Sequence, residues 1–95
     1  MRLREIIWKQ RFAEKIEHKH GLTTTEVEEA LFGRSIIRKI ERGKARGEHV
    51  YVAYGQTRAG RYVVVFFVYK RSKAALPISA RSMTDTERNY YEKQK

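Results

Sequence analysis

The stretch that most constrains the fold of this chain is Gly60–Lys70, which reads GRYVVVFFVYK. In a β-strand its side chains would alternate between two faces, formed by Val63, Val65, Phe67 and Tyr69 on one side and by Tyr62, Val64, Phe66 and Val68 on the other. Because both faces are apolar, the pattern predicts a strand that is covered on both sides. β-branched and aromatic side chains also favour strands over helices. We therefore place this stretch at the centre of a sheet, whose neighbours and helical cover must come from the rest of the chain.

The size and composition of the chain limit what it can be. Its 95 residues suffice for one domain with a single core, so we expect residues 1–95 to form one domain. The absence of cysteine excludes disulfides and thiolate metal sites and is compatible with a reducing compartment. No apolar run approaches the ~20 residues that span a bilayer, and the first residues lack the apolar stretch of a signal peptide. We therefore expect a cytoplasmic protein with no membrane partner.

The positive charge of the chain is confined to its middle. The net charge is +10, and residues 34–83 carry all of it, with twelve Lys or Arg side chains against Glu41 and Glu48. Concentrated positive charge attracts polyanions and gains affinity by releasing counterions. The segregation therefore favours nucleic acid or an acidic protein as a partner, although net charge in a small domain can also serve solubility alone.

The first part of the chain predicts a short strand and a helix. Arg2–Ile7 fits the strand, and Trp8–His20 fits a helix with a narrow apolar stripe of Trp8, Phe12 and Ile16. Gly21 is suited to end this helix, because glycine enters the left-handed conformation without a Cβ penalty.

A second helix has a well-defined start. With Thr23 as the N-cap, Glu26 falls at the third helical position and completes a capping box. Leu22 and Val27 then occupy the two positions of a hydrophobic staple. Gly33 is expected to end this helix.

Three further strands are predicted around the central one: Ile36–Arg42, Glu48–Gln56 and Ala74–Arg81. The connections are expected to be two basic turns and a hairpin turn, at Gly43–Gly47, Arg71–Lys73 and Thr57–Gly60. In the last strand we expect one face toward the core and one away from it, formed by Leu76, Ile78 and Ala80 and by Ser79 and Arg81, respectively. Pro77 donates no ladder hydrogen bond, which predicts an edge position or a bulge.

The end of the chain predicts a third helix. Thr84 and Glu87 form a second capping box, which opens a helix that reaches Lys93. So short a helix must dock on the domain, through Tyr90, Tyr91 or both. The chain is therefore expected to be an α+β domain, with an antiparallel sheet of about four to five strands, two N-terminal helices and one C-terminal helix.

Most chemical motifs are absent or weak. His18 and His20 are two positions apart, so on a helix they diverge by about 200° and do not form the i, i+4 pair of a metal site. No nucleotide-binding loop or nucleophile elbow is present. At Arg81, a strand leads into the N-terminus of a capped helix, which can hold an anion. Arg81 could equally pair with Asp85 or Glu87, and chemistry alone leaves both readings open.

Several segments in this order resemble one family: Trp8, the KHG of Lys19–Gly21, GEHVYVAYGQTRAGR at Gly47–Arg61, the VVVFFVY strand, and ISARSMTDTERNYY at Ile78–Tyr91. Together they are similar to the BrnT family of bacterial type II toxins. The resemblance implies a RelE-like fold and a metal-independent ribonuclease that needs no cofactor and arrests growth by cleaving RNA. It also implies neutralisation by a DNA-binding antitoxin, BrnA.

The resemblance and the residue chemistry together suggest the site. Metal-free cleavage uses the ribose 2′-hydroxyl as nucleophile, so the protein must move protons and stabilise the charge of the phosphorane. For charge stabilisation we expect Arg61 and Arg81, and for proton transfer His20 and Glu87. Further RNA contacts are expected from Lys19, Arg58, Ser79 and Tyr91. Two alternatives stay open, namely a non-catalytic basic nucleic-acid-binding module and a structural role within a protein complex.

Overall fold

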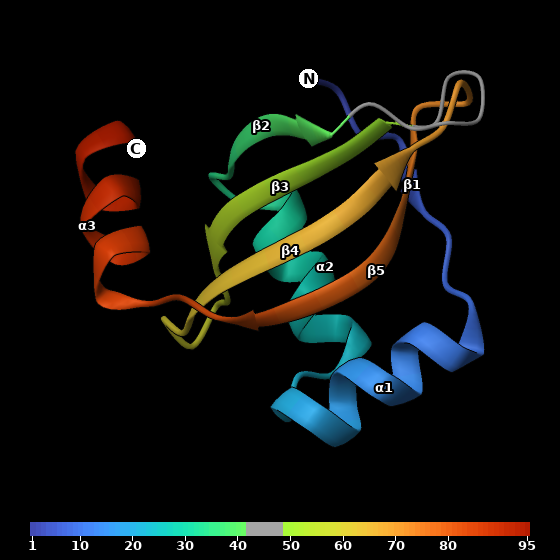
Figure 1. The fold of residues 1–95 in the computed structure, drawn as a ribbon, viewed down its shortest axis with the longest axis horizontal. Coiled ribbons are helices and arrows are strands. Elements are labelled where there is room, and N and C mark those ends of the chain that lie inside the picture. The colour runs from blue at the N-terminus through green and yellow to red at the C-terminus, as the bar shows by residue number, and fades with distance from the viewer. Residues whose placement is uncertain (42–48) are drawn as a thin grey trace.

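The computed structural model describes residues 1–41 and 49–95, which form a five-stranded sheet with three helices (Figure 1). In chain order the elements are β1 (Glu5–Ile6), α1 (Gln10–His20), α2 (Thr24–Phe32), β2 (Ile36–Glu41), β3 (His49–Gln56), β4 (Tyr62–Tyr69), β5 (Ala74–Ser82) and α3 (Asp85–Gln94). The predicted turn Gly43–Gly47, together with Arg42 and Glu48, lies outside the described residues.

The sheet has β4 at its centre, as the sequence predicts. The strand order is β1-β5-β4-β3-β2, and β2 to β5 are joined by antiparallel pairing. The short β1 pairs in parallel with β5, so the sheet is mixed rather than wholly antiparallel. The predicted α+β class is confirmed.

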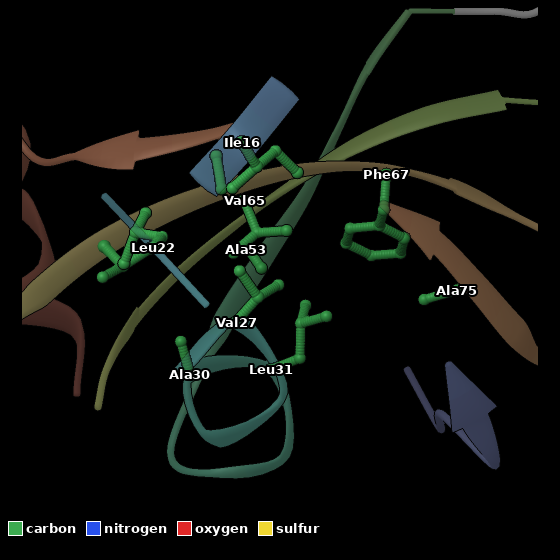
Figure 2. Packing of buried hydrophobic residues seen from close by; sticks show 11 residues of the cluster. Ile16, Leu22, Val27, Ala30, Leu31, Ala53, Val65, Phe67 and Ala75 are labelled. Atoms are coloured by element: carbon green, nitrogen blue, oxygen red, sulfur yellow. The ribbon is translucent and has the colours of Figure 1, made fainter. Parts of the chain in front are cut away.

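One face of the sheet packs against α1 and α2 and forms the core (Figure 2). Val63, Val65 and Phe67 of β4 are fully buried there. The capping box of Thr23 and Glu26 forms as predicted, and both residues of the staple, Leu22 and Val27, enter the core. The local signals at the start of α2 therefore also fix which side of the helix meets the sheet.

The close approach of α2 to β3 depends on a glycine. A Cβ atom at Gly55 would lie 2.5 Å from the carbonyl oxygen of Ala30. No side-chain carbon can be placed at that distance from a backbone oxygen without moving the helix. Gly55 therefore sets the distance between these two layers.

The N-terminal helix differs from its prediction at its start. Helix α1 begins at Gln10, so Trp8 precedes it and is not part of a helical stripe. The indole Nε1 of Trp8 instead donates to Glu28 Oε2 of α2 at 2.8 Å. Within α1 only Ile16 is buried, and Phe12 is half-buried. Gly21 ends the helix with φ +64°, as expected for a glycine in the left-handed conformation.

The other face of the sheet is only partly covered. Val64 and Val52 are buried on this face, whereas Phe66 and Val68 are half-buried. The prediction that β4 is covered on both sides therefore holds for Val63, Val65 and Phe67 on the helical face, where Tyr69 is half-buried, and only in part for the other face. We call this surface the open sheet face and define it by the paired residues Arg38, Val52, Tyr54, Val64, Phe66, Ser79 and Arg81.

A bulge in β5 changes which side chains face the core. Phe66 pairs with Ser79 and Phe67 with Pro77, which leaves Ile78 as the extra residue. The bulge next to Pro77 is one of the two outcomes that the sequence predicts. Because one extra residue reverses the alternation, Leu76 pairs with Val68 and lies on the side of the open face. Leu76 is buried, as expected, but on the side of the open face rather than against the helices.

Helix α3 stands at one end of the open sheet face, away from α1 and α2 (Figure 1). Its Thr84 capping box forms as predicted. Both expected tyrosines dock it: the ring of Tyr90 lies 5.0 Å from that of Tyr54, and the Tyr91 hydroxyl donates to the carbonyl of Arg34 at 2.7 Å. In the described part of the chain, no helix is long and apolar enough to cross a membrane.

Replacing the central core residue should destabilise the domain strongly. We expect Phe67→Ala to lower the free energy of unfolding by about 3–5 kcal/mol, because Phe67 is fully buried and leaves a cavity. Phe32→Ala is the matched control, since Phe32 is 53% exposed and should cost less than about 1 kcal/mol. Denaturant unfolding measures both, and equal losses would contradict the assigned core.

Candidate active site

The most strongly organised polar contact on the open sheet face joins Arg81 and Glu87. Arg81 is near the end of β5, and Glu87 is in the first turn of α3. The two terminal nitrogens of Arg81 donate to the two carboxylate oxygens of Glu87, at 2.7 and 2.8 Å. This bidentate geometry is the strong form of an arginine–carboxylate pair. Of the two acids that the sequence leaves open as partners, Glu87 makes this pair.

The capping box of α3 fixes the position of Glu87. Its Oε1 accepts a hydrogen bond from the backbone N–H of Thr84 at 2.8 Å, and the Thr84 hydroxyl accepts one from the Glu87 backbone at 3.2 Å. The carboxylate is thus held at the helix end by the local sequence Thr-Asp-Thr-Glu, independently of Arg81. The strand end then brings the guanidinium to it.

The surroundings of Arg81 combine an aromatic ring with solvent access. Its guanidinium carbon lies 5.6 Å from the ring centre of Phe66, within reach of a cation–π contact. Arg81, Val64 and Tyr54 form one row across the sheet, and Ser79 pairs with Phe66 in the next row. The Arg81 side chain is 35% exposed. A ligand could therefore approach this arginine from the open sheet face.

Each member of the pair stabilises the charged form of the other. The hydrogen bonds from Arg81 lower the pKa of Glu87, burial opposes this effect, and the Thr84 backbone bond lowers that pKa further. The same pairing raises the pKa of Arg81. Both groups are therefore charged at neutral pH. A carboxylate with a lowered pKa is a weak base, which is unfavourable for the proton-transfer role expected of Glu87.

Arg61 makes a different kind of contact, to the backbone at the end of α1. Its guanidinium donates to the carbonyls of His20 and Gly21, at 2.9 and 3.1 Å. It also donates to the hydroxyl of Ser82 at 3.1 Å. These bonds satisfy carbonyls that a helix leaves without partners at its C-terminus. Arg61 thus ties the end of α1 to the end of β5.

The four expected catalytic residues fall into two groups. Arg81 and Glu87 lie on the open sheet face, whereas Arg61 bonds to the end of α1, where His20 lies. Arg61 reaches the carbonyl of His20 rather than its imidazole. The groups share one end of the sheet, because the Ser82 that Arg61 contacts directly follows Arg81 in β5.

The expected RNA contacts are spread over the same end of the molecule. Lys19 is exposed near the end of α1, and Ser79 is half-buried beside Phe66. Arg58 lies in the turn between β3 and β4, where its side chain is 90% exposed. These three positions are open to a ligand in different directions.

Tyr91 does not fit the expected RNA contact. It is only 2% exposed, and its hydroxyl donates to the backbone of Arg34. Burial also raises the pKa of its phenol. Its role is to dock α3. The aromatic residue beside Arg81 is instead Phe66, which the sequence could have assigned to the site, since strand pairing places it opposite Ser79.

The candidate site is an open surface rather than a pocket. Two surface hollows of about 590 and 460 Å³ lie elsewhere, one on the exposed side of α1 and one between α2 and the turn at Thr57 and Arg58. Neither is lined by Arg81 or Glu87. Among residues 1–41 and 49–95, no group of three or more His, Cys, Asp or Glu is placed to hold a metal ion.

The fold is similar to that of a ribonuclease toxin of known structure. The chain is similar to the crystal structure of the Brucella abortus ribonuclease toxin BrnT, with a TM-score of 0.61 and 23% sequence identity over 85% of this chain and 97% of that one. Residues 8–87 match the model of the family described as ribonuclease toxin, BrnT, of type II toxin-antitoxin system. The chain therefore belongs to the BrnT family. No curated protein matches it.

Removing Arg61 should weaken the fold. We expect Arg61→Ala to lower the free energy of unfolding by about 1–2 kcal/mol, because partly exposed bonds to carbonyl groups of α1 are lost. Arg58→Ala also removes an arginine side chain, but from a position where it is 90% exposed, so the free energy of unfolding should fall by less than about 0.5 kcal/mol. Urea unfolding compares the two variants. Equal stability would show that Arg61 does not hold the end of α1.

The Arg81–Glu87 pair should make the free energy of unfolding depend on pH in the acidic range. Because the pKa of Glu87 is lower in the folded protein than its ordinary value of 4.5, folding favours its ionised form. The pair then contributes about 1 kcal/mol or less above pH 4.5, since it is partly exposed, and this contribution is lost as the pH falls through the lowered pKa.

Glu87→Gln should therefore be less stable than the wild type at pH 7 and equal to it in strong acid. Asp85→Asn removes a charge from an exposed position on the same turn and is the control. Unfolding in urea between pH 7 and pH 3 gives the free energy of unfolding of each variant and of the wild type as a function of pH. A constant difference between wild type and Glu87→Gln at all pH values would contradict the assignment.

Proposed function

We propose that this chain is a metal-independent endoribonuclease, the active component of a type II toxin-antitoxin pair. Membership of the BrnT family and the net charge of +10 support an RNA substrate. The observation that carries the proposal is the position of Arg81. It presents a charged, partly exposed guanidinium on an open sheet face next to the half-buried ring of Phe66.

The proposed reaction is attack of the ribose 2′-hydroxyl on the adjacent phosphate. The 2′-oxygen forms a bond to phosphorus as its proton passes to a base, and the bond from phosphorus to the 5′-oxygen breaks as that oxygen takes a proton, which leaves a 2′,3′-cyclic phosphate. The phosphate gains negative charge in the transition state. Arg81 would donate two hydrogen bonds to the phosphate oxygens, because its planar fork matches two oxygens of a phosphate. Phe66 would offer a surface against which a neighbouring base stacks.

The other residues take supporting roles in this proposal. Glu87, ionised beside Arg81, would hold the guanidinium at the site before RNA binds, rather than transfer a proton. His20 stays the candidate for proton transfer, and Arg61 would position it by holding its backbone carbonyl. Lys19, Arg58 and Ser79 would contact other parts of the RNA.

A non-catalytic nucleic-acid-binding module is the second candidate. The observation in its favour is the set of half-buried aromatic rings on and beside the open sheet face, Phe66, Tyr54 and Tyr90. Such rings stack on bases without any chemistry. Cleavage in the presence of EDTA separates the two functions, because the module would bind RNA and leave it intact.

We further propose that a DNA-binding antitoxin similar to BrnA holds the chain inactive. An antitoxin is implied by the type II family. An acidic segment of such a partner would compete with RNA for the basic middle of the chain, so the complex should weaken with salt. Co-purification with the product of the neighbouring gene tests this, and RNA cleavage that continues unchanged in that complex would contradict it.

Arg81 should affect turnover more than RNA affinity. If Arg81 stabilises charge that develops only in the transition state, Arg81→Ala should lower the cleavage rate about 10²–10³-fold. Arg81→Lys should restore little, because a point charge does not reproduce the two-pronged geometry. Cleavage of RNA in EDTA, RNA affinity and the urea midpoint are measured on each variant.

Arg88→Ala is a matched control, since Arg88 lies in α3 near the same surface and packs over the ring of Tyr62. It should leave the rate within a few-fold of the wild type. A folded Arg81→Ala protein with full activity would exclude the catalytic assignment.

A further inference from the structure

Glu87 occupies the edge of the Arg81 guanidinium that carries both terminal nitrogens, with hydrogen bonds of 2.7 and 2.8 Å. One of these nitrogens also donates to the carbonyl of Ser82 at 3.2 Å. A carboxylate and a phosphate present a similar pair of acceptor oxygens to an arginine. An RNA phosphate that binds this edge of the guanidinium therefore needs the two donors that Glu87 holds, and both cannot hold them in this geometry at once.

We propose that Glu87 is an internal competitor of the substrate, whose carboxylate occupies Arg81 until a phosphate of the RNA displaces it. This inference rests on the proposed function, since it takes an RNA phosphate as the ligand of Arg81. It assigns to Glu87 the control of RNA affinity.

Glu87 can stay in place after Arg81 leaves it. Its Oε1 also accepts from the Thr84 backbone, and the Thr84 hydroxyl accepts from the Glu87 backbone. Docking of α3 relies on other contacts, between Tyr90 and Tyr54 and from the Tyr91 hydroxyl to the backbone of Arg34. The exchange therefore requires movement of one long side chain and leaves the helix undisturbed.

The exposure of the pair suits an exchange of partners. The side chains of Arg81 and Glu87 are 35% and 20% exposed. Water can replace part of what each loses, so breaking this pair is far less costly than breaking a fully buried one. A phosphate that approaches over the open sheet face meets Arg81 beside the ring of Phe66.

The test measures RNA binding by variants of Glu87. The probe is a short 2′-O-methyl RNA oligonucleotide, which carries the phosphates and lacks the 2′-hydroxyl nucleophile. Glu87→Gln keeps a capping-box residue at this position but removes the charge that binds Arg81. Asp85→Asn removes one negative charge from the same turn of α3 and controls for the change in net charge.

Glu87→Gln should bind the probe about threefold to fivefold more tightly than Asp85→Asn, which is the range expected for a partly exposed ion pair. Glu87→Asp should also bind more tightly than the wild type. Its net charge is unchanged, but its shorter side chain cannot reach Arg81 with both oxygens. In the background of Arg81→Ala, Glu87→Gln and Asp85→Asn should have equal effects.

Equal affinities of Glu87→Gln and Asp85→Asn would overturn the proposal, as would a gain that persists without Arg81. Cleavage of ordinary RNA in EDTA by the wild type is measured alongside. If the competition is seen and no RNA is cut, the proposed ribonuclease function fails alone. If RNA is cut and the Glu87 variants bind as their controls do, the competition fails alone.

Discussion

The packing of one face of the sheet, with β4 at its centre, against α1 and α2 is the interaction on which the rest of the structure depends. Val63, Val65 and Phe67 are fully buried at this contact, together with Ile16, Leu22 and Val27 from the helical side. In a domain of this size there is one such core, and most of its stability comes from apolar burial. The close contact at Gly55 brings α2 near enough to exclude water from that core.

The two faces of β4 differ in exposure because helices cover only one of them along its length. Helix α3 covers just one end of the other face and docks there through Tyr90 and Tyr91. Phe66 consequently keeps part of its ring accessible, beside Arg81. A flat surface with positive charge and an accessible aromatic ring suits an extended polymer better than a small molecule. The candidate site therefore lies where the helices leave this face of the sheet uncovered.

The short segment from Ser79 to Glu87 contains three residues of the candidate site, Ser79, Arg81 and Glu87. A bulge next to Pro77 sets the alternation that turns Ser79 and Arg81 to the open sheet face. Three residues after Arg81, Thr84 starts α3, and its capping box fixes the carboxylate that Arg81 meets. The cap is a local feature, whereas the bulge depends on the pairing of β5 with β4. Their combination produces a charged pair whose members are both held in place from outside the pair.

The sequence by itself determined the elements of this protein. The central strand, the glycine end of α1, both capping boxes and the docking of α3 through its tyrosines all follow from local rules of periodicity and hydrogen bonding, and these predictions are confirmed. The α+β class and the family follow from their order along the chain. Arg81 could also be named as a candidate site residue, because the sequence predicts a strand that leads at Arg81 into a capped helix.

Only the tertiary structure decided which of these residues meet. The register of β5 depends on a bulge that pairing with β4 places, so Leu76 is buried on the face opposite to the one expected. Arg61 reaches the end of α1, forty residues earlier in the chain, and Tyr91 is buried by contacts with Tyr62 and Arg34. Local rules cannot predict such contacts, because they arise from the packing of distant segments. For the same reason, the choice of Glu87 over Asp85 as the partner of Arg81 depended on where the strand end delivered the guanidinium.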